Sequence, residues 1–468
     1  MNEPGGIDSA GGMGLRTAVE GIAWPAIVPD AGAHLLALNL QLDRSQWWSL
    51  EVMQQHQFKQ LRALLAHAVA TVPHYQRDDA YRDWLCCPDE DARTAFRELP
   101  LLTRRQAQEA GKALYASVLP DHHGMVSEDE TSGSTGVPLR YRTTSVAGFF
   151  WNAIALREHL WHRRDFAARH AFIRSRDEAG LAPTWGLPSN LVFACGESAN
   201  LPIRRPLSEK RDWLLAMNPH YLMTTPSTLR ALAEIAFEGG LPLPRLREVR
   251  TVGETVTDSL RQLVHKAWGA GLVDIYSSSE CGLLALQCPQ TGHFHAQSEW
   301  AVVEVLNPQG KPCAPGDVGR IVVSPLHNFA MPLVRYDTGD FAEVGEACPC
   351  GRGLPRLTRI LGRHRNRLFL PDGDTSWPNL SSLPWVDLAP SLHRFQLLQR
   401  RDHSLLLRYE AGQVFSPDEC ERVSRALLAH LRCTLPLAFE RVQALPLSNA
   451  GKLEDFITEI DAAQGTRP

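Results

Sequence analysis

The order of hydrophobic and polar residues predicts one long helix followed by alternating strands and helices. Leucine and valine recur at positions 61, 64, 65 and 69, which places them on one helical face, and Pro73 ends this helix. Between residues 145 and 275 short apolar runs alternate with helical stretches, which is typical of parallel α/β layers. The expected strands are AFIRS (171–175), NLVFAC (190–195), YLMTT (221–225), EVRTVGE (248–254) and LVDIYSS (272–278). The expected helices, both closed by glycine, are TLRALAEIAFEGG (228–240) and DSLRQLVHKAWGAG (258–271).

The pattern changes in the last third of the chain. SEWAVVEV (298–305) and DVGRIVVS (317–324) predict strands of a more antiparallel sheet. Past Leu361 a stretch with basic residues, proline and glycine indicates a hinge, and two strands, a helix and a last strand follow it. We therefore expect an α/β protein in three parts. These are a flexible tail (1–30), a large N-terminal domain of layered α/β subdomains (31–361) and a small, mobile α+β C-terminal domain (362–468).

Composition and charge narrow the classes of function. The 468 residues are 44% hydrophobic and 21% charged, with a formal net charge of −4. The composition is typical of a globular fold, and the slightly negative net charge argues against a protein that mainly binds nucleic acid or an anionic membrane surface. No apolar run is long enough for a membrane-spanning helix, and the first residues, MNEPGGIDSAGGMG, lack the pattern of a secretory signal. Ten cysteines are too few for a disulfide scaffold, so we expect a cytoplasmic protein whose cysteines are thiols or metal ligands.

A segment rich in hydroxyl groups and glycine is the sharpest chemical signal in the chain. It consists of Thr131, Ser132, Gly133, Ser134, Thr135 and Gly136. Glycines let the backbone approach a ligand closely, and backbone N–H groups and hydroxyls can surround a phosphate. No lysine follows the second glycine, so this is not a phosphate loop of the G-x-x-x-x-G-K-[ST] type. Taken alone, the segment is explained equally well as a polar surface turn.

Four further motifs follow this segment along the chain. They are Tyr276-Ser277-Ser278-Ser279-Glu280, Tyr336 to Asp340 (YDTGD), Gly362-Arg363 and Gly451-Lys452. The ordered set resembles the adenylate-forming (AMP-binding) ligases. Six further segments resemble the phenylacetate–coenzyme A ligase-like branch of this family, which includes capsule-biosynthesis adenylating relatives. They are VPHYQ (72–76), LPLLTRRQ (99–106), PSTLRALAE (226–234), FAMPLVRYDTGD (329–340), CPCGRGLPRL (348–357) and FQLLQ (395–399). Each motif is weak, but five in the right order over residues 45–455 form a strong signal.

The resemblance implies how the phosphates of ATP would be handled. Such enzymes join a carboxylate to ATP, release pyrophosphate and hold an acyl-adenylate. The segment from Thr131 to Gly136 would donate hydrogen bonds to the β- and γ-phosphates, and Glu280 would coordinate Mg²⁺, a hard ion that prefers carboxylate oxygen. Lys452 would reach the substrate carboxylate and the α-phosphate, where negative charge accumulates. The resemblance thus implies Lys452, Glu280 and Thr135 as catalytic residues.

The nucleoside half of the site is implied in the same way. Asp340 would accept hydrogen bonds from the ribose hydroxyls, and Arg363 would hold the ribose–phosphate region from the hinge. Adenine would lie beside Gly253, Glu254 and Tyr276, with Ser277, Ser278 and Ser279 completing the nucleotide-binding motif. Ordinary structural explanations stand beside these roles: a turn aspartate for Asp340, a first-turn helix acid for Glu280 and a surface lysine for Lys452.

Two single positions and one run of four residues depart from the family pattern. Val137 stands where the family usually has lysine, and Ser277 stands where it usually has glycine. After Arg363 the run His364-Arg365-Asn366-Arg367 replaces an acidic, glycine-bearing stretch that normally serves the second half-reaction. The sequence therefore supports adenylation more directly than thioester formation.

Cysteine and histidine residues suggest a metal centre. Cys288 and His295 precede the pair Cys348 and Cys350 by some fifty residues. Spacing alone favours buried thiols, because the common zinc pairing is C-x₂-C. Members of the resembling branch often carry a comparable set. The resemblance therefore implies one structural Zn²⁺ bound by Cys288, His295, Cys348 and Cys350, with His293 as the alternative fourth ligand.

The function expected from the resemblance is an ATP- and Mg²⁺-dependent carboxylic acid ligase. It would form the acyl-adenylate of an aryl or related small acid, and then a thioester with coenzyme A or with phosphopantetheine on an acyl carrier protein. Aromatic residues Phe149, Phe150 and Trp151 would line the acid pocket, although a helix-face core position explains any one of them. Transfer to an amine or hydroxyl, an inactive zinc-stapled scaffold and a homodimeric assembly stay open as alternatives at this point.

Overall fold

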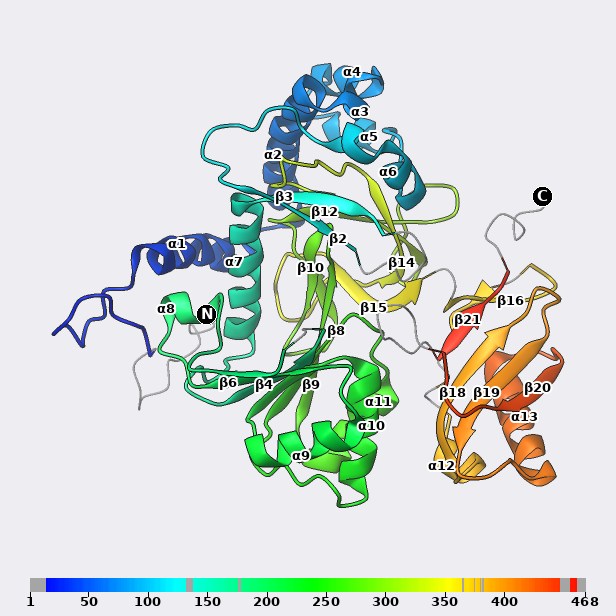
Figure 1. Ribbon diagram of the computed structural model, residues 1–468. Helices are drawn as coiled ribbons and strands as arrows, with labels where there is room; N and C mark the ends of the chain where they lie inside the picture. Colours follow the sequence, from blue (N-terminus) through cyan, green and yellow to red (C-terminus); the bar gives the residue numbers. More distant parts are fainter. Residues whose placement is uncertain are drawn as a thin grey trace.

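The computed structural model describes residues 14–131, 138–175, 178–363, 366–373, 375–378, 380, 383–446 and 455–460. Its helices are α1 Asp30–Ser45, α2 Leu50–Thr71, α3 Pro73–Gln76, α4 Ala80–Cys86, α5 Ala92–Phe96, α6 Arg104–Ala110, the 3₁₀ helix η1 Gly111–Leu114, α7 Ser145–Trp161, α8 Ser189–Val192, α9 Leu207–Met217, α10 Pro226–Phe237, α11 Asp258–Trp268, α12 Trp385–Leu388 and α13 Pro417–Leu431. A large body and a smaller C-terminal unit lie side by side (Figure 1). No helix among the described residues is long and apolar enough to cross a membrane.

The strands of the large body form one sheet of thirteen strands. They are β1 Leu102–Thr103, β4 His170–Arg174, β5 Gly180–Ala182, β6 Ser198–Pro202, β7 Tyr221–Thr224, β8 Glu248–Val252, β9 Gly271–Ser278, β10 Gly282–Gln287, β11 Phe294–Ala296, β12 Ala301–Leu306, β13 Val318–Pro325, β14 Tyr336–Val344 and β15 Arg356–Arg363. Their order is β12-β13-β14-β15-β11-β10-β9-β8-β7-β4-β6-β5, with β1 paired to β14. A separate hairpin is formed by β2 Val126–Glu130 and β3 Arg140–Thr144.

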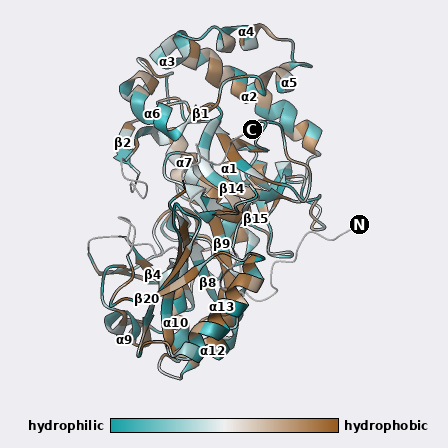
Figure 2. Ribbon diagram, turned by 90° about the vertical axis from the view of Figure 1, so that its right-hand side faces the viewer, coloured by the Kyte–Doolittle hydropathy of each residue, from teal (hydrophilic) through white to brown (hydrophobic). Residues whose placement is uncertain are grey.

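The sheet changes character in its middle. Strands β6, β4, β7, β8 and β9 are paired in parallel, whereas every pair from β9 through β10, β11, β15, β14 and β13 to β12 is antiparallel. Helices α9, α10 and α11 gather below the parallel part in Figure 1, and their leucines share one hydrophobic cluster with its strands. The α/β and antiparallel parts that the sequence predicts are both confirmed, and Figure 2 shows hydrophobic colours along the central strands.

The helices form where the sequence supplies both an apolar face and end signals. Helix α2 begins at Ser49, whose hydroxyl accepts from the Val52 N–H, and it buries the predicted leucine face. Helix α11 ends at Gly269 in the left-handed conformation that favours glycine. Helix α1 is not among the sequence predictions; it buries one face, which places Leu35 and Leu42 in the main hydrophobic core.

One predicted strand is wrong. Residues 190–195 do not form a strand: Ser189–Val192 is the short helix α8, and Phe193 makes only an isolated bridge to Leu15. The strand lies further on, as β6. A short apolar run has the same hydrophobic pattern in a buried strand and in a buried helical turn, and tertiary packing against α1 decides here.

The C-terminal unit has its own sheet and core. Strands β18 Leu392–Gln399, β19 Leu405–Ala411, β20 Leu437–Arg441 and β21 Phe456–Thr458 lie in the order β20-β19-β18-β21, and β16 Leu368–Phe369 pairs with β17 Thr375–Ser376. Helix α13 begins with a capping box between Ser416 and Glu419 and packs on the sheet. The predicted strand pair, helix and following strand are confirmed; β21 is an additional strand.

Candidate nucleotide site and Cys/His cluster

The centre of the candidate site is the carboxylate of Glu280, in the turn between β9 and β10. Its side chain is only 6% exposed. The Tyr336 hydroxyl donates to Oε1 of Glu280 at 2.9 Å, and Nη1 of Arg104 donates to the same oxygen at 3.2 Å. Nη2 of Arg104 donates to the hydroxyl oxygen of Thr131 at 2.6 Å. The first residue of the hydroxyl-rich segment is therefore linked to Glu280 through one guanidinium group.

Sheet register brings these residues together. Strand β1 pairs in parallel with β14, with Leu102 opposite Tyr336. Arg104 follows directly as the first residue of α6, which is capped by Thr103 and Gln106. On the other side, Gly282 starts β10 with φ +88°, and a Cβ atom there would lie 2.8 Å from the Trp300 ring. Glycine thus permits the tight turn that presents Glu280.

A second carboxylate, that of Asp340, lies on β14, four residues after Tyr336. The Tyr276 hydroxyl on β9 donates to Oδ2 of Asp340 on β14 at 2.9 Å. The Arg363 Nε lies 3.5 Å from Oδ1, because Arg363 stands opposite Asp340 where β15 pairs with β14. Burial, and then the charge of Asp340, raise the pKa of Tyr276 well above its usual value, so the phenol remains a proton donor.

The Cys/His cluster lies where β10, β11 and β15 meet. The ligand atoms of Cys288, His295, Cys348 and Cys350 all lie within 4.8 Å of one another, and His295 is fully buried. The His295 Nε2 faces the Cys350 sulfur at 3.3 Å, and its Nδ1 lies 3.2 Å from the Leu354 carbonyl oxygen. That carbonyl contact is the kind that fixes the tautomer and orientation of a ligating imidazole.

The four residues fit a tetrahedral zinc ion. Zinc–ligand bonds of about 2.0–2.3 Å imply ligand atoms roughly 3.3–3.8 Å apart. The four ligand atoms lie within 4.8 Å of one another, and His295 Nε2 and the Cys350 sulfur are 3.3 Å apart. Burial lowers the pKa of His295 to about 4, so the imidazole is neutral at pH 7, as a ligand must be. Burial opposes ionisation of Cys288, but hydrogen bonds from Gln290 and Thr291 outweigh it and lower the pKa of its thiol.

Comparisons with known proteins show which proteins the chain resembles in sequence and in fold. No family model matches the chain. It is 28% identical to the phenylacetate–coenzyme A ligase of Thermus thermophilus over 283 residues, which is 54% of this chain and 63% of that protein, less than two thirds of its length. It is 27% identical to the same ligase of Pseudomonas putida over 70% of this chain and 74% of the relative. The Escherichia coli enzyme of that name is 26% identical over 71% and 76%. The structure resembles 2-hydroxyisobutyryl-CoA ligase in the postadenylation state with a TM-score of 0.70, at 17% identity over 90% of this chain and 92% of that one.

The chain is similar in sequence to phenylacetate–coenzyme A ligases, as the motifs predict, and its fold is that of adenylate-forming ligases, with a large N-terminal and a small C-terminal domain. The same 2-hydroxyisobutyryl-CoA ligase in the thioesterification state matches with a TM-score of 0.57 and 18% identity.

Several residues predicted from the sequence lie outside the described part of the chain. They are Ser132, Gly133, Ser134, Thr135, Gly136, Val137, His364, Arg365 and Lys452. Their roles stay predictions. The described neighbours bracket them: Thr131 is the first residue of the hydroxyl-rich segment, and Asp455, the first described residue after Lys452, accepts the Leu397 N–H through its carbonyl oxygen at 2.7 Å.

The remaining nucleotide-motif residues lie around the same strand ends. Gly253 follows β8 with φ +85°. Glu254 accepts hydrogen bonds from the backbone N–H and the hydroxyl of Ser227, at 2.8 and 3.0 Å, which ties the loop after β8 to the start of α10. Ser277 lies opposite Leu283 in the β9–β10 pair, and the Ser278 hydroxyl accepts from the Cys281 N–H at 3.1 Å.

A cavity of about 350 Å³ opens beside Ser279 and Glu280. Trp151 lines it together with Trp300. Phe149 and Phe150 do not line it and pack instead against the main hydrophobic core, with the Phe150 ring 3.7 Å from that of His327. Successive helical residues point about 100° apart, so three neighbours on α7 cannot share one cavity. The predicted aromatic trio is therefore corrected to Trp151 alone.

Sequence reasoning missed two residues of the Glu280 cluster and left one choice open. Arg104 lies within LPLLTRRQ and Tyr336 starts YDTGD, so both stand in recognised motifs without an assigned role. His293, the alternative zinc ligand, points its Nδ1 at the Thr358 carbonyl oxygen at 3.1 Å and is not part of the cluster. His295 is the histidine that joins the three cysteines.

Proposed function

We propose that the chain uses ATP and Mg²⁺ to convert a small carboxylic acid into an acyl-adenylate and then transfers the acyl group to coenzyme A. The observation that carries the proposal is the reciprocal pairing of two tyrosines and two carboxylates. Tyr276 donates to Asp340, and Tyr336 donates to Glu280. Tyr276 lies on β9 and Glu280 in the turn after it, whereas Tyr336 and Asp340 both lie on β14, so each of these two segments supplies one tyrosine and one carboxylate.

The chemistry of the first step matches these groups. An oxygen of the acid attacks the α-phosphorus, the bond to the β-phosphate oxygen breaks, and pyrophosphate leaves. Glu280 would hold the Mg²⁺ ion, which offsets charge on the phosphates when bound. The Thr131 segment would donate hydrogen bonds to the phosphates, Asp340 would accept from the ribose hydroxyls, and Lys452 would meet the charge that develops at the α-phosphate.

In the second step the sulfur of coenzyme A attacks the acyl carbonyl carbon, the bond to AMP breaks, and AMP leaves. Phosphopantetheine on an acyl carrier protein offers the same thiol. The acid is proposed to be aryl or similarly small, because Trp151, Trp300 and Tyr141 line the cavity beside Glu280. ATP and coenzyme A as co-substrates go with the expected cytoplasmic location.

We further propose that Cys288, His295, Cys348 and Cys350 bind one structural Zn²⁺. Four protein ligands would complete the tetrahedron and leave no position for a reacting water. Such an ion would connect the end of β10 with the loop before β15 and stabilise the sheet that carries Asp340 and Arg363.

Acid-dependent exchange of pyrophosphate into ATP tests the proposed activity over a panel of aryl and alkyl acids. Exchange should require the acid and should fall by on the order of 10² or more in Glu280→Gln. Glu343→Gln is the matched control, because Glu343 lies on β14 but pairs with Arg359 at the surface. AMP release that depends on coenzyme A then tests the acceptor. If no acid supports exchange, the activity is refuted; exchange without thiol-dependent release refutes only the transfer to coenzyme A.

A further inference from the structure

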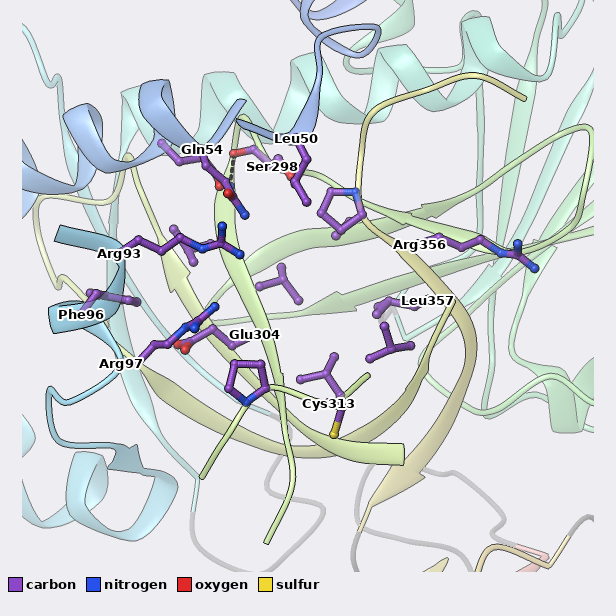
Figure 3. Close-up of a pocket in the computed structure, with 18 of the residues that line it drawn as sticks. Leu50, Gln54, Arg93, Phe96, Arg97, Ser298, Glu304, Cys313, Arg356 and Leu357 are labelled. Atoms are coloured by element: carbon purple, nitrogen blue, oxygen red, sulfur yellow. Dashed lines mark hydrogen bonds between the residues drawn. The ribbon is translucent and has the colours of Figure 1, made fainter. Parts of the chain in front are cut away.

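A second cavity, of about 240 Å³, lies between α2, the α5 segment and the antiparallel part of the sheet (Figure 3). Its walls are largely apolar and include Leu50, Phe58, Phe96, Val302 and Leu357. None of its lining residues lines the cavity beside Glu280, and none belongs to the nucleotide motifs. The cavity is therefore a separate feature of the large body.

Two guanidinium groups converge on this cavity. Arg93 and Arg97 stand four residues apart, one helical turn, and Figure 3 shows both side chains pointing into the cavity beside Gln54. In the part of the chain that the structure describes, neither guanidinium has a hydrogen-bond or ion-pair partner. Burial, and then the charge of Arg97, lower the pKa of Arg93.

The acids near the cavity attract Arg93 and Arg97 without forming an ion pair with either, and Glu304 interacts with the charge of Arg97 as well as with that of Arg335. Glu304 lines the cavity, but Arg335 already holds its carboxylate, with Nε at 3.1 Å and Nη2 at 3.3 Å. Glu51 attracts Arg93 from the first turn of α2 without forming an ion pair. A third cation, Arg356, lines the wall with its stem, and its guanidinium points away from the cavity in Figure 3.

We propose that this cavity is a binding site for a small carboxylate with an apolar body, distinct from the acid site of the proposed reaction. The planar carboxylate matches the guanidinium donors of Arg93 and Arg97, and the hydrocarbon part would cover the walls formed by Phe58, Phe96 and Leu357. The volume is below the roughly 300–1,000 Å³ of sites for drug-sized ligands, which limits the ligand to a small acid. Inorganic phosphate has no apolar part, so it would leave the apolar walls of the cavity exposed to water.

The thiol of Cys313 provides a reporter inside the site. It lines the cavity and is half-buried, whereas Cys86 on α4 is exposed and lies outside the cavity. Alkylation by iodoacetamide at pH 8.5 would be followed at both cysteines by peptide mass spectrometry, with phenylacetate as the probe. At ten times its dissociation constant, phenylacetate should slow alkylation of Cys313 about tenfold, because only the unoccupied fraction reacts, and should leave Cys86 unchanged.

Charge variants make the test specific. The double variant Arg93→Gln, Arg97→Gln should need at least about tenfold more phenylacetate for the same protection, because it loses charge-assisted hydrogen bonds. Lysine at both positions should keep part of the protection. Arg105→Gln, an exposed arginine on α6, is the matched control and should behave like wild type. The neutral analogue phenylacetamide should protect weakly.

A second measurement covers the case in which Cys313 does not react. Equilibrium dialysis of radiolabelled phenylacetate should count one site fewer per chain in the double glutamine variant than in wild type. Equal protection and equal stoichiometry in wild type and this variant would overturn the proposal, as would the absence of any difference between phenylacetate and phenylacetamide. Glu280→Gln should keep full protection of Cys313, which separates failure of this site from failure of the proposed ligase activity.

Discussion

Arg104 offers the most direct test of how the site is assembled. One guanidinium group links Thr131 to Glu280, and its Nε is buried without a partner. Arg104→Met keeps most of the side-chain volume and removes both hydrogen bonds. Among the described residues, Glu280 then retains only the Tyr336 hydroxyl, and Thr131 retains only the Leu139 N–H as its donor. We expect both groups to lose their fixed positions relative to the phosphates of ATP.

The size of the effect follows from the two contacts. Hydrogen bonds to charged groups contribute roughly 1.5–3 kcal/mol each, so the pair amounts to roughly 3–6 kcal/mol. The Arg104 side chain is 20% exposed and its neighbours can relax. About half of the total, roughly 1.5–3 kcal/mol, should therefore be lost, which corresponds to a fall in kcat/KM of pyrophosphate exchange by roughly 10- to 150-fold. Arg104→Lys should lose less, because an ammonium group keeps the charge but cannot reach both partners as a planar fork does.

The assay is pyrophosphate exchange as a function of free Mg²⁺. If Arg104 positions Glu280, the Mg²⁺ concentration for half-maximal rate should rise in Arg104→Met as the rate falls, whereas a purely structural defect would lower the melting temperature without that shift. Arg105→Met is the control, since Arg105 is 84% exposed and faces only Glu109 on the same helix. Exchange within about threefold of wild type, with unchanged Mg²⁺ dependence, would refute the assembly described here.

Three further predictions concern other parts of the chain. Lys452→Ala should lower kcat of adenylation by on the order of 10² or more with ATP binding nearly intact, which exchange kinetics and nucleotide titration would check; near-normal exchange would remove Lys452 from the mechanism. Purified protein should contain about one zinc per chain, and Cys348→Ser should lose both the metal and thermal stability, as measured by elemental analysis and melting; a metal-free wild type after chelator-free purification would contradict this. Burial raises the pKa of Asp274 to about 7, so the folded state keeps a proton that the unfolded chain releases near pH 4, and stability falls as pH rises between these values. Asp274→Asn should therefore gain stability relative to wild type between pH 5 and pH 8; a stability difference independent of pH would sink this reasoning.

Local patterns account for the parts of the fold that the sequence predicts correctly. Helices α2, α10, α11 and α13 are amphipathic and carry their own end signals, such as the glycine after α11 and the capping box of α13. These signals act within a few residues and need no tertiary contact. The short run 190–195 has no such signal, and its conformation depends on α1, which the sequence pattern did not reveal either.

The candidate site divides in the same way. The motif order was sufficient to indicate an adenylate-forming ligase and to select Glu280, Asp340 and Tyr276. It could not select Arg104, because the role of this residue comes from β1 lying beside β14, a pairing between segments more than two hundred residues apart. Nor could helical spacing alone separate Trp151 from its two aromatic neighbours.

The Cys/His cluster shows where sequence information ends and tertiary structure decides. From the sequence alone, three cysteines and two histidines were candidate ligands, and the spacing was compatible with either histidine. Pairing of β11 with both β10 and β15 turns His295 toward Cys350 and leaves the ring of His293 against the Thr358 carbonyl. Residue types and motif order are properties of the chain itself, whereas the direction of a side chain on a sheet depends on register between distant strands, which forms only when the whole sheet folds.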